Sequence, residues 1–370
     1  MPSWRRWSVR RKIAVALLVC VSGALAATAV SYWRFLAHRA GRGSVALSWP
    51  ASLGAGEAAE LLADVGLTGS ARWLTLYFTV AGARHCFVPG PHLLGPATPK
   101  ELAAMLCRGS GRNTAKVTLP EGVNRFTVAD RLAAAGVVAR EAFLRASADR
   151  ALLGSLGIDR PALADAAVAS AADSAEGFLF PATYQLHLDS DPAELVRVLV
   201  READRRFRQV ADKHPQGAGA LAAMALSRRQ IVALASMVEK EAAAAEERPI
   251  IASVFLNRLR DPELPRLQSD PTAVYGCYAM PERIPACRGF DGKATPEINR
   301  DPQNAFSTYV ISGLPPGPIA NPGDASLEAV LAPADTRFRY FVAKGGGRHT
   351  FSETYAEHLE AVRQLREARP

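Results

Sequence analysis

Apolar residues in the second half of the chain repeat with the spacing of a helix. Ile231, Leu234, Ala235 and Val238 stand at i, i+3, i+4 and i+7, which is typical of a helix packed on one side. Glu241 continues this row, three residues after Val238, so its side chain is expected over apolar neighbours. A carboxylate held against apolar surface has its charged form disfavoured and its pKa raised. Glu241 is therefore a candidate general acid.

Glu239 competes with Glu241 for this role. It lies two residues earlier, about 200° away around a helix, so the two carboxylates are expected on different faces. The helical angles separate them only weakly, because the apolar arc is broad. Taken alone, a Glu-x-Glu pair on an alanine-rich helix is most often a solvated face.

The residues that follow predict a second helix and two loops. Pro249 suits the first turn of a helix whose apolar row continues to Leu259. Residues 266–272, with the sequence RLQSDPT, are polar and turn-forming. Residues 313–323, with the sequence GLPPGPIANPG, predict a rigid loop of low conformational entropy.

The first third of the chain begins with a membrane-spanning pattern. Residues 13–33 carry no charge over a length that crosses the hydrocarbon core as a helix. Five basic residues precede this run, so the positive-inside rule predicts residues 1–12 in the cytoplasm and the rest outside the membrane. The alternative is a cleaved signal peptide ending near Ala24-Leu25-Ala26. The apolar run continues to Trp33, which favours a retained anchor. Both interpretations export the globular part.

Length and charge narrow the classes of function. A chain of 370 residues has room for more than one domain and a sizeable core. Its formal charge of +8 comes from arginines that are scattered rather than gathered beside aromatic residues. This distribution argues against a nucleic-acid partner and favours attraction to a membrane surface.

Four cysteines after the predicted span form an even set. Pairing in an oxidising compartment allows three connectivities. Cys277 with Cys287 closes a short loop and is the preferred bridge, while Cys86 with Cys107 is a second pair. The alternative is four buried thiols. No cysteine has a zinc-ligand spacing with the seven histidines.

The remaining elements are short. Residues 72–80 predict a strand by their β-rich content, residues 117–122 a strand and turn, and residues 340–343 a late strand. Helices are predicted at 99–107, 127–135, 192–210 and 355–366.

Several linked motifs together resemble one family. In order they are ASMVEKE, ERP, VFLNRL, LQSDPT, GLPPGPIANPG and a late HTF. This order resembles the endolytic murein transglycosylases of the MltG or YceG-like type, over roughly residues 73–360. The resemblance implies an α+β fold with a transmembrane helix at 13–33, a periplasmic tether at 34–71, a small LysM-like α/β module at 72–165 and a mainly helical catalytic domain with short strands at 166–370.

The resemblance also implies functional residues and partners. The second Glu of the EKE triplet is catalytic in that family, and it is Glu241 here. The implied substrate-binding residues are Gln268, Asp270, Thr272, Tyr275, Ser307 and Tyr309. No cofactor or metal is implied. The implied partners are peptidoglycan glycan strands, the inner membrane and peptidoglycan synthases, with the catalytic domain in the periplasm and a glycan associate for the LysM-like module. A module that only orients the catalytic domain is the alternative.

The sequence departs from the family pattern at two motifs. Ala182 stands where an Asp is common in EGxLFPDTY, which removes one polar contact. Phe306 and Ser307 replace the first two residues of YNTY, so we expect any sugar hydrogen bond there to weaken or move to Tyr309. His349 is a candidate for the cleft, although a histidine on a strand is more often structural.

The resemblance implies a lyase that cleaves the bond between MurNAc and GlcNAc without water, leaves 1,6-anhydro-MurNAc ends and terminates strand elongation. One carboxyl group suffices for this reaction, whereas ordinary glycosidases use two. A hydrolytic muramidase is the alternative enzyme, and would need Asp270 or Glu246 as its base. A membrane-anchored peptidoglycan-binding scaffold with little turnover is the alternative outside enzymes.

Overall fold

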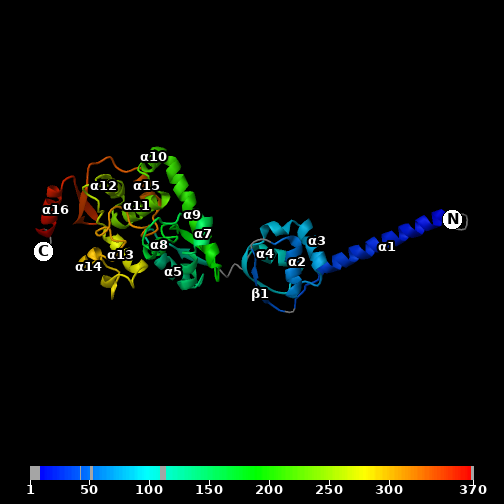
Figure 1. The fold of residues 1–370 in the computed structure, drawn as a ribbon. Coiled ribbons are helices and arrows are strands. Elements are labelled where there is room, and N and C mark those ends of the chain that lie inside the picture. Colours follow the sequence, from blue (N-terminus) through cyan, green and yellow to red (C-terminus); the bar gives the residue numbers. More distant parts are fainter. Residues whose placement is uncertain (1–8, 42, 51–52, 109–113, 368–370) are drawn as a thin grey trace. The chain divides into compact units, whose positions relative to one another are not determined.

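A computed structural model describes residues 9–41, 43–50, 53–108 and 114–367, and the chain divides into two compact units (Figure 1). The first unit extends to Thr114 and the second from Ala115 to the end. The second unit therefore contains residues 115–165, which were expected in the LysM-like module at 72–165. Arg5, Arg6 and most of the predicted cytoplasmic segment lie outside the described residues.

The first unit begins with α1 (Val9–Ala37), a 29-residue helix. Its apolar side chains, including Leu17, Leu18 and Leu25, are more than half exposed. None of its residues is buried within the described part of the chain. A helix needs about 20 apolar residues to span a bilayer. The helix is long and apolar enough to cross a membrane, and it fits a single-pass anchor.

The rest of the first unit is a small α/β module. Two antiparallel strands, β1 (Val45–Trp49) and β2 (Gly90–Leu94), pair in the register Val45 to Leu94. Three helices complete it: α2 (Ala55–Asp64), α3 (Ala71–Val80) and α4 (Pro99–Arg108). Trp49, Leu62, Phe78 and Leu106 meet in its core. Residues 45–49 and 55–64, parts of the expected tether, are thus folded, whereas the LysM-like character of the module stays a prediction.

The expected strand at 72–80 is wrong, because these residues form α3. Ser70 caps the helix by accepting a hydrogen bond from the Trp73 backbone N–H. Leu74 and Phe78, four residues apart, are fully buried against α2, whereas Leu76 and Val80 are exposed. A strand would have placed all four side chains on one face. Tertiary burial at helical spacing overrides the β-rich composition.

The second unit is mainly helical. Its helices are α5 (Arg125–Ala134), α6 (Arg140–Ala146), α7 (Arg150–Ser155), α8 (Ala166–Ala172), α9 (Pro192–Lys213), α10 (Pro215–Ala223), α11 (Arg228–Glu241), α12 (Arg248–Arg260), α13 (Asp270–Ala279), α14 (Pro296–Arg300), α15 (Asp324–Leu331) and α16 (Tyr355–Glu367). Two two-stranded sheets join them, β3 (Thr114–Thr118) with β4 (Thr183–His187) and β5 (Tyr340–Gly345) with β6 (Arg348–Ser352). The predicted helices at 99–107, 127–135, 192–210 and 355–366 and the strand at 340–343 are confirmed, and the mixed, mainly helical fold is as expected.

Both predicted cysteine pairs are present as disulfides. Cys277, near the end of α13, is bonded to Cys287, and Cys86 is bonded to Cys107 at the end of α4. The alternative of four thiols is therefore wrong. The first bridge closes a ten-residue separation beside the LQSDPT segment.

Helix α11 is the centre of the second unit. It packs against α12, α13 and α15 (Figure 1). Every residue from Ile231 to Val238 is buried, so the helix is enclosed on all sides rather than on one apolar face. The helix returns to the surface at its last turn, where Lys240 is exposed and Glu241 partly exposed. The end of this helix is where a polar group can be both held firmly and reached by a ligand.

Candidate active site

Helix α11 presents Glu241 as its last residue. The helix begins with a capping box, in which Ser227 and Gln230 satisfy each other's backbone N–H groups. At the other end, the Ala242 N–H closes the final turn on the Val238 carbonyl. A carboxylate at a helix C-terminus faces the negative end of the helix dipole, which disfavours its ionised form. The position alone therefore favours a protonated Glu241.

The surroundings of Glu241 raise its pKa to about 7. Removal from water is the main cause, and the negative charge of Asp270 adds to it. The Ser269 hydroxyl donates a hydrogen bond of 2.6 Å to Glu241 Oε1, which favours the ionised form and limits the rise. Glu241 is partly exposed rather than buried, so a substrate oxygen has access to it. A carboxyl group with these properties can donate and recover a proton near neutral pH.

Asp270 lies beside the acid on the exposed surface. It starts α13, and its Oδ1 accepts hydrogen bonds from the Tyr309 hydroxyl at 2.7 Å and from Asn299 Nδ2 at 2.8 Å. Burial and this carboxylate together raise the pKa of Tyr309 above its ordinary value, so its hydroxyl stays protonated. The two donors fix the direction of the Asp270 carboxylate. The structure thus brings Glu241, Asp270 and Tyr309 together, as predicted.

Asn299 is a site residue that sequence reasoning missed. It lies on the short helix α14, 29 residues after Asp270, and is 9% exposed. Its Oδ1 is buried and has no hydrogen-bond partner among the described residues. The segment carries no motif that singles out this amide, so only the folded chain places it beside the carboxylate.

Gln268 adopts a strained backbone next to the acid. Its φ of 56° lies in the left-handed region, which is uncommon for residues other than glycine. Its N–H donates to the Thr308 carbonyl, and its Oε1 accepts a 3.0 Å hydrogen bond from Arg258 Nη2. Gln268 is exposed. A strained backbone of this kind persists where surrounding contacts hold it in place. Here it directly precedes Ser269, the residue that contacts the acid.

Three predicted substrate-binding residues lie below the surface. Thr272 and Ser307 are 0% exposed and Tyr275 is 3% exposed. The Thr272 hydroxyl donates to the Ser269 carbonyl, and the Ser307 hydroxyl donates to the Asn299 carbonyl. The hydroxyls of Thr272 and Ser307 are therefore engaged within the protein, and we assign these two residues to positioning Ser269 and Asn299. Tyr275 packs against Phe306 in the core.

The departure at Phe306 also falls in the core. Phe306 is fully buried, with its ring centroid 5.1 Å from that of Tyr275 in an edge-to-face arrangement. A hydroxyl at this position would point into the core rather than to the surface. The missing hydroxyl at Phe306 therefore affects packing in the core rather than contacts at the surface.

Glu239 is directed away from the acid. Its carboxylate pairs with Arg248 at 3.5 Å and accepts a hydrogen bond from the Gly323 N–H at 3.1 Å. Its side chain is only 6% exposed, so Glu239 is a buried structural ion pair and not a solvated residue. The two carboxylates have separate roles because they leave the helix in different directions.

His349 is held by a neighbouring carboxylate. Its backbone N–H and Nδ1 contact Glu247 at 3.0 and 2.7 Å. Burial raises the pKa of Glu247, but the hydrogen bonds to His349 outweigh this effect and leave it below its ordinary value. The positive charge of His349 lowers the pKa of Glu241. Glu246, the other residue considered as a base, is exposed and pairs with Arg348.

The proline-rich loop at 313–323 holds α11 from its flank. The Ile319 N–H donates a 3.0 Å hydrogen bond to the Ser236 hydroxyl in the middle of the helix. Asn321 donates to Glu176 Oε1 at 3.1 Å and accepts from the Leu179 N–H at 2.9 Å. The loop therefore connects α11 to residues 176–181, the EGFLFP segment.

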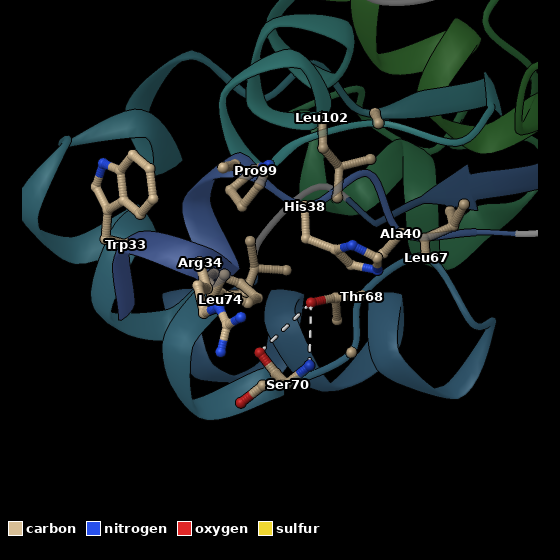
Figure 2. A pocket seen from close by; sticks show the side chains of 14 residues that line it. Trp33, Arg34, His38, Ala40, Leu67, Thr68, Ser70, Leu74, Pro99 and Leu102 are labelled. Atoms are coloured by element: carbon tan, nitrogen blue, oxygen red, sulfur yellow. Dashed lines mark hydrogen bonds between the residues drawn. The ribbon is translucent and has the colours of Figure 1, made fainter. Parts of the chain in front are cut away.

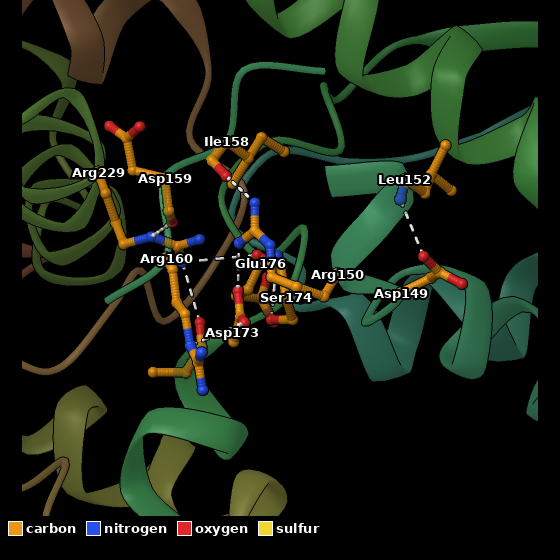
Figure 3. Close-up of polar contacts among 11 residues, drawn as sticks. Asp149, Arg150, Leu152, Ile158, Asp159, Arg160, Asp173, Ser174, Glu176 and Arg229 are labelled. Carbon is orange, nitrogen blue, oxygen red and sulfur yellow. Dashed lines mark hydrogen bonds and ion pairs between the residues drawn. The ribbon is translucent and has the colours of Figure 1, made fainter. Parts of the chain in front are cut away.

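The first turn of α11 is fixed by Arg229. Figure 3 shows its guanidinium directed to Asp159, and Nε donates to the Asp159 carbonyl at 2.9 Å. Nη1 donates to the Ala172 carbonyl at 2.9 Å. With Arg229 at one end and the proline-rich loop along its side, α11 holds Glu241 in a single position. Among the described residues, no group of three or more His, Cys, Asp or Glu side chains is placed to hold a metal ion.

The fold and this site define a mixed α/β protein with one protonatable carboxyl group at a polar surface. The model of the YceG-like family matches residues 50–364 of the chain. The protein belongs to the YceG-like family.

Two similar proteins are endolytic murein transglycosylases. An endolytic murein transglycosylase of Bacillus subtilis is 32% identical over 187 residues, 50% of this chain and 46% of that protein. One of Streptococcus pneumoniae is 27% identical over 172 residues, 45% of this chain and 28% of that protein. These matches span less than half the length of either relative. A crystal structure of a putative YceG-like protein of Listeria monocytogenes has a TM-score of 0.53 and 27% identity, and covers 86% of this chain and 98% of that one.

Proposed function

We propose that this protein is an endolytic lytic transglycosylase. It cleaves the β-1,4 bond between MurNAc and GlcNAc in nascent peptidoglycan strands and leaves 1,6-anhydro-MurNAc ends. The observation that carries the proposal is the partly exposed Glu241, whose pKa is raised to about 7. The names of its relatives support murein as the substrate.

In this reaction Glu241 acts first as an acid and then as a base. The protonated carboxyl donates to the glycosidic oxygen as the bond from that oxygen to the muramyl anomeric carbon breaks. The carboxylate then takes the proton of the C6 hydroxyl while the C6 oxygen bonds to the anomeric carbon. The proton balance closes on Glu241 without water. Ser269, which donates to Oε1, stabilises the carboxylate between the two steps.

Exposed polar groups beside the acid suit the binding of a sugar. Gln268, Asp270 and Tyr309 remain our proposed substrate contacts, because the structure leaves Gln268 and Asp270 exposed and Tyr309 partly exposed. Asp270 also places a negative charge next to the positive charge that develops at the anomeric carbon. A single acid with a nearby charge requires no second catalytic carboxyl.

Hydrolysis is the second candidate, and Asp270 is the observation in its favour. An inverting muramidase needs a second carboxylate to activate water. Asp270 is exposed and lies close enough to raise the pKa of Glu241, whereas Glu246 is paired with Arg348. Asp270 already accepts from Tyr309 and Asn299, which limits its freedom to take a proton from water.

The apolar helix α1 supports a location for this reaction at a membrane. We propose a single-pass protein of the inner membrane, with residues 1–12 in the cytoplasm and the catalytic unit in the periplasm. Cleavage of nascent strands next to the membrane would end their elongation, in company with peptidoglycan synthases. The small α/β module of the first unit is our candidate glycan-binding, LysM-like module.

Product analysis tests this proposal. Uncrosslinked glycan strands are digested, and the products are separated and weighed by mass spectrometry. We expect 1,6-anhydro ends from the unmodified protein. Glu241→Gln keeps the size of the side chain but cannot donate a proton, so cleavage should fall by about 10² to 10⁴-fold while glycan binding survives.

Glu239→Gln is the matched control, because it makes the same change on the same turn of α11. It should alter cleavage by less than about tenfold, since Glu239 has a structural partner in Arg248. Reducing ends would identify a muramidase, and an absence of products would identify a scaffold. Loss of activity in Glu239→Gln with near-normal activity in Glu241→Gln would refute the assignment of the acid.

A further inference from the structure

A cavity of about 510 Å³ lies at the end of α1, in the first unit and outside the candidate active site. Its wall includes Leu67, Leu74 and Leu102, and its polar groups include Arg34 and His38 (Figure 2). Neither its volume nor its residues have a part in the proposed cleavage. A hollow of this size accommodates a small ligand or one part of a larger one.

Helix α1 and the module share this cavity because they are packed together. The Tyr32 and Trp73 rings lie 5.1 Å apart, which joins the last turns of α1 to α3. Ala40 and Ala97 exchange backbone hydrogen bonds of 3.1 Å, and Phe35 packs against the core of the module. The cavity is therefore a built feature of the fold.

The length of the uncharged segment determines the level at which the cavity would lie relative to the membrane. Residues 13–33 number 21 and rise by about 1.5 Å each, so they span about the thickness of the hydrocarbon core. Arg34 and His38 follow directly and line the cavity. If α1 crosses the membrane as proposed above, the cavity opens at the level of the lipid headgroups.

No acidic side chain lines the cavity among the described residues. Arg34 and His38 are its ionisable lining residues, and both are basic. Arg39, nearby, is paired with Glu101 at 3.1 Å, whereas no ion pair forms at Arg34 among the residues that the structure describes. Thr68 and Ser70 add hydroxyl groups to the wall (Figure 2). The opposite wall is apolar.

We propose that this cavity binds the phosphate headgroup of a lipid in the outer leaflet. Arg34 provides a planar, permanently charged guanidinium, which suits a phosphate, and His38 and the two hydroxyls complete the polar side. The leucines of the wall receive the first carbons of the lipid chain. A phosphate at the level of the headgroups can belong to an anionic phospholipid or to a polyprenyl phosphate. Both carry a phosphate attached to an apolar chain, which is the chemistry that the cavity would bind.

Native mass spectrometry of the full chain in a neutral detergent tests this inference. The protein is titrated with phosphatidylglycerol, with undecaprenyl phosphate, with diacylglycerol as a lipid without phosphate, and with inorganic phosphate alone. We expect either or both phosphate lipids to bind at least tenfold more tightly than diacylglycerol. Which of the two binds more tightly identifies the source of the phosphate.

Variants locate the binding. Arg34→Gln should weaken phosphate-lipid binding at least tenfold, and Arg34→Lys should restore part of it. Arg72→Gln removes an exposed arginine of the same unit outside the cavity and should leave binding unchanged. Equal binding of diacylglycerol, or equal losses in Arg34→Gln and Arg72→Gln, would overturn the proposal. The titration requires neither cleavage nor a membrane, so its failure is separate from failure of the proposed function or topology.

Discussion

At the scale of single residues, the proposed chemistry depends on one carboxyl group that is protonated near neutral pH. The influences on the pKa of Glu241 include loss of water, the charge of Asp270 and a hydrogen bond from Ser269. The first two favour the protonated form, and the third stabilises the ionised form. A group balanced in this way can serve as acid and base in successive steps.

The balance predicts a pH profile that Ser269 controls. Because Glu241 must be protonated to donate, cleavage should fall as pH rises through about 7. Ser269→Ala removes a hydrogen bond that favours the ionised form, so the pKa of Glu241 rises further and the falling limb should move upward by about one pH unit. The rate of cleavage measured from pH 5 to pH 9 checks this. Ser312→Ala, on the exposed surface, is the control; a profile of Ser269→Ala that coincides with it would contradict the prediction.

At the scale of elements, α11 is positioned by segments far away in the sequence. Asn321 joins the proline-rich loop to Glu176, a carboxylate that is 1% exposed. Glu176 Oε2 accepts a second hydrogen bond, at 2.8 Å, from the Arg125 N–H at the start of α5. Burial raises the pKa of Glu176 to about 7, and the hydrogen bonds only partly oppose this. Glu176, which holds the proline-rich loop and the start of α5 together, is thus also a titratable group.

Glu176 makes the stability of the second unit depend on pH. The rise of its pKa from 4.5 to about 7 corresponds to about 3 kcal/mol. Between these values the unfolded chain releases its proton while the folded chain keeps it, so the free energy of unfolding should fall as pH rises, and level off above about 7. Glu241, whose pKa is also raised to about 7, contributes a similar slope, so Glu176→Gln should remove about half of the total.

Urea unfolding at pH 5 and pH 8 measures this effect. All five tryptophans lie at or before Trp73, so the second unit is followed by far-UV circular dichroism rather than by tryptophan fluorescence. Glu239→Gln serves as the comparison, because it removes a buried carboxylate from another contact. An equal pH dependence in Glu176→Gln and the unmodified protein would refute this role of Glu176.

At the scale of the whole molecule, a membrane helix and two separately folded units divide the work. No residue of α1 is buried among the described residues, whereas each globular unit has its own buried core. One disulfide lies in each unit. Disulfides persist in oxidising compartments, which agrees with an exported globular part.

The disulfide of the second unit is expected to stabilise it. Closing a loop of about ten residues lowers the entropy of the unfolded chain. In the chain-entropy model this raises the free energy of unfolding by about 2–3 kcal/mol. The double variant Cys277→Ser, Cys287→Ser should lose about this much in urea unfolding. Thiol labelling of the denatured, unreduced protein supplies the independent check, and labelling of both Cys277 and Cys287 would show that the bridge is absent.

The orientation of the chain is the last expectation at this scale. The uncharged run at 13–33 and the basic residues before it predict that the globular units lie outside the cytoplasm. Protease added to spheroplasts should therefore digest the globular part, and a cytoplasmic protein should stay intact as the control. Complete protection of the C-terminal unit would contradict this topology.

Local signals were sufficient where a segment carries its own caps and a regular apolar row. Asp191 caps α9 and Asn124 caps α5, and both helices were predicted from sequence. The uncharged run of α1 and the candidate acid Glu241 were also visible, because each depends on spacing within about seven to 21 residues. Such patterns act through contacts between near neighbours.

Tertiary structure decided the features that depend on distant segments. Residues 71–80 became a helix because Leu74 and Phe78 are buried against α2. Thr272 and Ser307 were assigned to the substrate by motif, yet the fold buries both and directs their hydroxyls to backbone carbonyls. Burial is a property of the packed chain, and one sequence motif can supply both surface and buried residues. The chain alone therefore predicted the helix and proposed Glu241 as its acid, and packing determined the neighbours of that residue.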